Sequence, residues 1–97
     1  SQDSEFTKNY KQAMHWYRRA AEQGNPEAQH NMAAMYFDGR GIPQDYVQAY
    51  AWFSVAAANG VEISPPERDK TAKRLTPEQL AKGQELAASY FEKYQPK

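Results

Sequence analysis

An internal repeat is the feature that most constrains the fold of this chain. Residues 9–24 read NYKQAMHWYRRAAEQG and residues 45–60 read DYVQAYAWFSVAAANG, so the two segments align without a gap. Their offset of 36 residues is typical of helical solenoids, in which similar units stack side by side. The identical pairs are Tyr10 and Tyr46, Gln12 and Gln48, Ala13 and Ala49, Trp16 and Trp52, Ala20 and Ala56, Ala21 and Ala57, and Gly24 and Gly60.

Each unit reads as two helices joined by a tight turn. Apolar residues recur at helical spacing after Asn9, a residue type that caps helix starts, and the pattern stops at Gly24. The run 25–27, Asn-Pro-Glu, predicts the start of a second helix, whose apolar stripe is Ala28, Met32, Met35 and Tyr36. Residues 38–44 then form the turn into the next unit, where Asp45 caps again.

The second copy is incomplete, which suggests the end of an array. A short helix is expected over 65–74 with Ser64 as its cap, and Thr76 with Gln79 predicts a capping box that starts a longer helix. We therefore expect one all-α domain over residues 1–97: an α-solenoid of about one and a half stacked antiparallel helix-turn-helix repeats. The first repeat would span 9–44, the second, divergent one 45–75, and a C-terminal capping helix 76–94.

Residues 16–46 and 49–60, which include the turns EQGNPEAQ and GRGIPQDY, resemble the Sel-one-like repeats (SLR), relatives of the tetratricopeptide repeats. One departure is the alanine pair Ala33 and Ala34, where the family usually has a glycine. The resemblance implies a right-handed superhelix that serves as a scaffold for partner proteins. It also favours a periplasmic or cell-envelope location, because many bacterial members of the family are found there.

Composition excludes several classes of function. Twelve basic and twelve acidic residues give a formal net charge of zero, which argues against a nucleic-acid binder. The chain has no cysteine and no apolar run long enough to span a bilayer. Because it begins at Ser1 without a signal-like stretch, it reads as a piece of a longer protein.

The sequence offers little for catalysis. The two histidines, His15 and His30, have no acid at metal-ligand spacing and are expected on the surface, and no serine stands in a nucleophile motif. We therefore expect no enzyme activity, no cofactor and no metal site. Trp16 and Trp52 occupy equivalent positions, so both are expected to pack between helices.

The clearest functional signal is a difference between the two copies. Where the first helix carries charged residues, the matching helix of the second copy is apolar, so that face is either covered by the C-terminal helix or open as a groove for a partner. The predicted partner-binding residues are Lys11, His15, Arg18, Arg19 and Glu22 from the first copy, and Val47, Ala51, Ser54 and Val55 from the second.

The expected partner is a protein or peptide held on the concave repeat surface. A cell-envelope polysaccharide- or peptidoglycan-binding module and a β-lactam-binding protein stay open as alternatives, and both are suggested by relatives in the family. Self-association is a further expectation, because the edge formed by Phe6, Tyr10 and Met14 has no preceding unit in this sequence.

Overall fold

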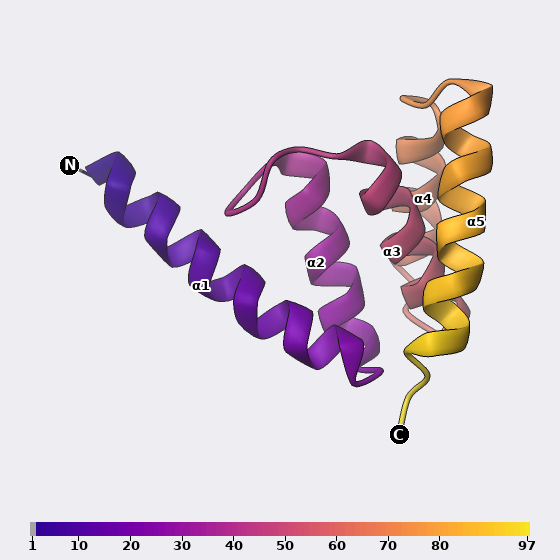
Figure 1. Ribbon diagram of the computed structural model, residues 1–97, viewed down its shortest axis with the longest axis horizontal. Coiled ribbons are helices and arrows are strands. Elements are labelled where there is room, and N and C mark those ends of the chain that lie inside the picture. Colours follow the sequence, from indigo (N-terminus) through magenta and orange to yellow (C-terminus); the bar gives the residue numbers. More distant parts are fainter. Residues whose placement is uncertain (1) are drawn as a thin grey trace.

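The computed structural model describes residues 2–97, with side chains from Glu5 onward. In this part of the chain it contains five α-helices and no strand, arranged as two hairpins followed by a final helix (Figure 1). The all-α prediction is therefore confirmed. The helices are α1 (Gln2–Glu22), α2 (Pro26–Asp38), α3 (Tyr46–Ala58), α4 (Ser64–Ala72) and α5 (Pro77–Lys93).

The first helix is longer than the repeat pattern predicts. Asn9 lies inside α1 and caps nothing, because the helix already begins at Gln2. Its C-terminal end is as expected: Gly24 has φ 92°, its N–H donates to the carbonyl of Ala21, and the next N–H, of Asn25, donates to Ala20. This pair of bonds closes the helix and turns the chain toward α2.

The second helix supplies much of the core. Asn25 caps it by accepting a hydrogen bond from the backbone N–H of Ala28 at 2.8 Å, and Pro26 follows at the first helical position. The apolar stripe predicted for this helix is buried between α1 and α3. Its members are Ala28, Met32, Met35 and Tyr36.

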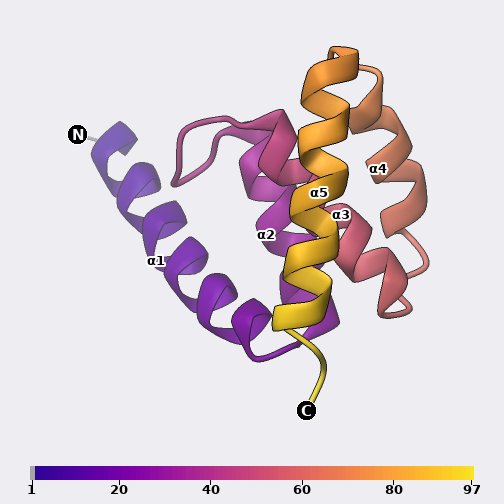
Figure 2. The same ribbon diagram turned by 45° about the vertical axis from the view of Figure 1, so that its right-hand side comes forward.

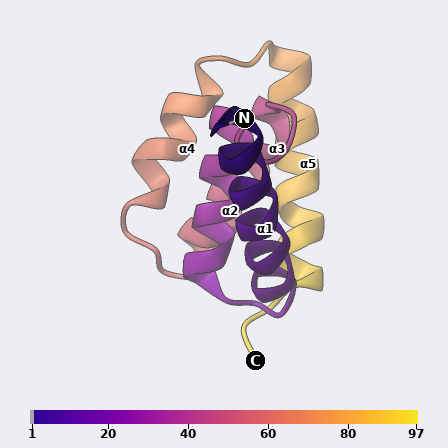
Figure 3. The same cartoon turned by 90° about the vertical axis from the view of Figure 1, so that its left-hand side faces the viewer.

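The third helix lies at the centre of the molecule. Asp45 caps it as predicted, through hydrogen bonds from the N–H groups of Val47 and Gln48 at 3.0 and 3.1 Å. α3 contacts α2, α4 and α5, and α4 and α5 lie on opposite sides of the molecule (Figure 3). A helix that is apolar nearly all round is stable in water only when it is covered in this way.

The last two helices differ in how they begin. Thr76 and Gln79 form the predicted capping box at the start of α5. The predicted cap of α4 is wrong, because Ser64 is already helical and buried, and its hydroxyl lies 2.8 Å from Nδ1 of His30. The serine therefore ties α4 to α2.

A buried glutamine joins the ends of three helices at one corner. Gln29 is fully buried, and its amide donates to the carbonyl of Ala21 at 3.1 Å and to that of Tyr94 at 3.3 Å. Its carbonyl accepts a hydrogen bond from Asn59 at 2.9 Å. A buried amide with these partners satisfied fixes the corner where α1, α3 and α5 end.

Candidate functional site

Five of the predicted partner-binding residues lie on one face of α1, which we call the α1 strip: Lys11, His15, Arg18, Arg19 and Glu22. Spacings of four, seven and eight residues place them on neighbouring turns of the helix. All are exposed except Arg18, which is half-buried and donates to the hydroxyl of Tyr36 at 3.0 Å. The strip is thus a polar surface with a positive charge.

An exposed tryptophan borders the α1 strip. Trp16 keeps 62% of its surface open to solvent, although large aromatic residues seldom stay this exposed. The guanidinium of Arg19 lies 5.4 Å from its ring centroid, and the ring of His15 meets it edge-on at 5.2 Å. The prediction that Trp16 packs between helices is therefore wrong. The ring stays exposed, and its contacts with His15 and Arg19 are made within α1.

The four predicted residues of α3, which we call the α3 row, are not an open surface: Val47, Ala51, Ser54 and Val55. Ala51 and Val55 have 0% and 1% of their surface exposed, so neither can contact a partner. Val47 is half-buried, and the half-buried Ser54 donates its hydroxyl hydrogen bond back to the carbonyl of Tyr50 at 2.8 Å. Ala51 and Val55 are therefore corrected from binding residues to structural ones, whereas a binding role of the half-buried Val47 and Ser54 stays a prediction.

The C-terminal helix is what covers the α3 row. The hydroxyl of Tyr90 in α5 donates to Gln48 at 3.0 Å on one side of the row. On the other side, Gly83 approaches Tyr50 so closely that a Cβ there would lie 2.8 Å from Cδ1 of the ring. Figure 2 shows α5 lying in front of α3, whereas α1 approaches α5 only at its C-terminal end, where the hydroxyl of Tyr94 donates to the carboxylate of Glu22 at 3.5 Å.

The second tryptophan is buried by the same contact. Trp52 is 3% exposed, and the rings of Tyr90 and Tyr94 stack on it with centroids 4.5 and 5.6 Å away. Stacked aromatic pairs of this kind add about 0.5–1.5 kcal/mol to the burial of their area. Here the packing prediction is confirmed.

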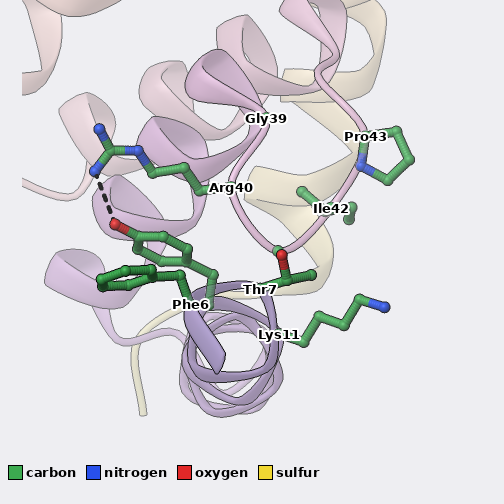
Figure 4. A pocket seen from close by; sticks show the side chains of 9 residues that line it. Phe6, Thr7, Lys11, Gly39, Arg40, Ile42 and Pro43 are labelled. Carbon is green, nitrogen blue, oxygen red and sulfur yellow. Dashed lines mark hydrogen bonds between the residues drawn. The ribbon is translucent and has the colours of Figure 1, made fainter. Parts of the chain in front are cut away.

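A large hollow lies between the first half of α1 and the α2–α3 loop (Figure 4). It has a volume of about 610 Å³, and its walls include Phe6, Lys11 and Ile42. The guanidinium of Arg40 donates to the hydroxyl of Tyr10 at 3.4 Å and lies 5.4 Å from the ring centroid.

The second copy contains the same arginine–tyrosine contact. Arg74 donates to the hydroxyl of Tyr46 at 3.5 Å and lies 5.6 Å from its ring centroid. A contact that recurs in both units, each time between a tyrosine of the unit's first helix and an arginine in the segment after its second helix, belongs to the repeat architecture. We therefore assign Arg40 a structural role.

The histidines have different environments. His15 is exposed as predicted, but His30 is half-buried, bonded to Ser64 and 5.1 Å from the ring of Phe53. Burial lowers the pKa of His30 below its ordinary value of 6.5, and the nearby Glu67 carboxylate partly offsets this shift. His30 is thus a packing residue that favours the neutral form.

The N-terminal edge of the first hairpin is only partly open. Met14 is 4% exposed and belongs to the core, so its assignment to this edge is wrong. Phe6 is exposed, and Tyr10 and Tyr17 are half-buried beside a hollow of about 240 Å³ between α1 and α2.

The described residues were also compared with the requirements of metal sites and of membrane-spanning helices. Among the side chains of residues 5–97, no three acidic, histidine or cysteine groups gather where they could hold a metal ion. In the same part of the chain, no helix combines the length and apolar character that crossing a membrane requires.

Comparisons with known proteins agree with this architecture. The chain is 43% identical to a solved protective antigen of uropathogenic Escherichia coli with an SLR fold, with a TM-score of 0.83 over 88% of this chain and 18% of that one. It is 41% identical over 51 residues to an exopolysaccharide production negative regulator of Rhizobium leguminosarum bv. viciae, over 53% of this chain and 19% of the relative. The chain therefore spans less than a fifth of either protein.

The match to the SLR-fold structure confirms the predicted α-solenoid. The family model of the Sel1 repeat matches residues 4–25 and 26–61, which together make up more than half of the sequence. The chain thus belongs to the Sel1 repeat family, whose members generally mediate protein–protein interactions.

Proposed function

We propose that this chain is a non-catalytic interaction module that holds a partner protein or peptide on the α1 strip. The proposal rests on a difference in exposure between the α1 strip and the α3 row, which occupy equivalent positions in the two copies of the repeat. The α3 row belongs to a helix that packs against α5, and Ala51 and Val55 in it are buried, whereas Trp16 and every residue of the α1 strip except the half-buried Arg18 are exposed.

The chemistry of the α1 strip suits a protein ligand. Tryptophan and arginine are enriched among the residues that dominate binding energy at interfaces, and here Trp16 and Arg19 are already in contact. Lys11 and Glu22 at the two ends of the strip add charges that steer the encounter and select partners. The binding site is thus smaller than the sequence predicts, since it excludes Ala51 and Val55.

A pull-down from cells that express the protein tests this proposal. The bait is compared with a Lys11→Glu/Arg19→Glu variant and with a charge-reversal control, Lys73→Glu, at the end of α4. We expect a protein that wild type and control capture and the double variant does not. A captured protein that binds all three baits equally would contradict the assignment of the α1 strip, provided circular dichroism shows that all three are folded.

We also propose that the N-terminal edge supports weak self-association. Its support is the exposed Phe6, 59% open, beside the half-buried Tyr10 and Tyr17. Light scattering at increasing concentration should show a rising mean mass that Phe6→Ser lowers. A constant monomer mass at millimolar concentration would refute it.

A further inference from the structure

We infer that the partner of the α1 strip is an acidic helix with two aromatic side chains four residues apart, which docks on α1 as α5 docks on α3. This inference rests on the function proposed above and adds the chemistry of the partner. It follows from the internal repeat, because Trp52 of the second copy shows how aromatic side chains pack on this repeat position.

The docking of α5 on α3 supplies the template. Tyr90 lies in the last turn of α5, and Tyr94, four residues later, is its C-cap, so both rings project from the C-terminal end of this helix. Both rings stack on Trp52, with interplanar angles of 17° and 25°. The docking site for α5 on α3 therefore consists of Trp52 and the neighbouring α3 row.

The first copy contains an equivalent docking site, which is largely open to solvent. The offset of the repeat places Trp16 at the position of Trp52, and the α1 strip at the position of the α3 row. The indole is largely exposed, and a hollow of about 590 Å³ opens beside it, bounded by the α1–α2 turn and by Pro96. The docking site on α1 thus offers an exposed aromatic ring and an adjacent hollow for a helix whose side chains stack on that ring.

The α1 strip and the α3 row differ in charge. The α3 row is apolar apart from Ser54, and it accepts the weakly charged α5. The α1 strip carries three cations, Lys11, Arg18 and Arg19, against one acid, Glu22, so a helix that covers it must supply carboxylates. A basic or purely apolar helix would leave these cations desolvated without partners.

A peptide derived from α5 provides the probe. It copies residues 76–95 with Lys82→Glu and Lys93→Glu, which makes it acidic and keeps both tyrosines, and it carries a fluorescent label for anisotropy titration. We expect Trp16→Ala to weaken its binding by about thirtyfold, as the loss of a tryptophan hot spot does. Arg19→Glu should weaken it by about tenfold, and the control Lys73→Glu should leave it unchanged.

A second peptide, with Tyr90→Ala and Tyr94→Ala in addition, separates stacking from charge and should bind as weakly to wild type as the first peptide binds to Trp16→Ala. Equal binding of the first peptide to wild type and Trp16→Ala, or no binding to wild type near 1 mM, would overturn the inference. Either failure leaves the proposed function standing if the pull-down still yields a protein lost with Lys11→Glu/Arg19→Glu. A pull-down in which no captured protein is lost with Lys11→Glu/Arg19→Glu would refute the proposed function, whatever the peptides do.

Discussion

The two copies of the repeat place the same tryptophan in opposite environments. Trp16 and Trp52 share their sequence context, yet one is 62% exposed and the other 3%. Part of the difference arises outside the repeat, in α5 and its C-cap, whose tyrosines stack on Trp52, whereas among the described residues only His15 of α1 itself brings a ring against Trp16. The same position thus stabilises the fold in one copy and is available for binding in the other.

The largest expected difference between the two copies is the effect of truncating each tryptophan on stability. Trp52→Ala removes a buried, doubly stacked ring and should lower the free energy of unfolding by about 3–5 kcal/mol. Trp16→Ala changes an exposed side chain and should cost less than about 0.5 kcal/mol. Urea unfolding followed by circular dichroism measures both, and similar losses would contradict the assigned roles.

The glycines that end α1 and α3 offer a second comparison. Gly24 and Gly60 have φ values of 92° and 96°, so alanine is strained at both. A Cβ at Gly60 meets nothing within 4 Å, whereas one at Gly24 would lie 2.1 Å from the carbonyl oxygen of Gln95. We expect a loss of about 1 kcal/mol for Gly60→Ala and about 2 kcal/mol for Gly24→Ala.

Removal of the C-terminal tail is the control for the glycine pair. In a chain that ends at Tyr94, the two alanine variants should lose similar stability in thermal or urea unfolding, because the steric conflict with residue 95 is gone. An extra loss for Gly24→Ala that persists in this background would show that the tail does not contribute it.

The arginine–tyrosine contacts should behave alike in the two copies. Arg40→Ala and Arg74→Ala each remove one exposed hydrogen bond and one cation–π contact, so each should cost about 0.5–1 kcal/mol. Double-mutant cycles with Tyr10→Phe and Tyr46→Phe isolate the hydrogen bonds. A cost confined to one copy would contradict a shared architectural role.

The smallest expected effect is a dependence of stability on pH that comes from His30. Because burial depresses the pKa of His30 in the folded state, the unfolded chain binds more protons below pH 6.5. Stability from this residue is therefore present above that pH and is lost as the pH falls through the lowered folded pKa. Unfolding curves from pH 7.5 to 5.0 should show a smaller acid loss for His30→Gln than for wild type, and equal losses would contradict this role of His30.

Much of the fold can be predicted from the sequence because its signals are local. The caps at Asn25, Asp45 and Thr76 and the glycine at the end of α1 depend on neighbouring residues alone. The start of α1 at Gln2 escapes prediction because the repeat pattern begins only at residue 9. The role of Ser64 escapes it because its partner, His30, is distant in sequence.

The candidate site is predictable in part for the same reason. Helical spacing is enough to place the α1 strip on one face. The burial of Ala51 and Val55 and the exposure of Trp16 depend on where α5 docks, and no local pattern reveals that docking. The signal that could have indicated it is the pair Tyr90 and Tyr94, whose spacing matches the stack on Trp52.

Acrylamide quenching of tryptophan fluorescence tests the central claim most directly. Trp16→Phe leaves Trp52 as the one tryptophan, and Trp52→Phe leaves Trp16. We expect strong quenching and red-shifted emission for the chain that retains Trp16, and weak quenching with blue-shifted emission for the chain that retains Trp52. Equal quenching of the two folded variants would contradict the claim that α5 covers the second copy and leaves the first open.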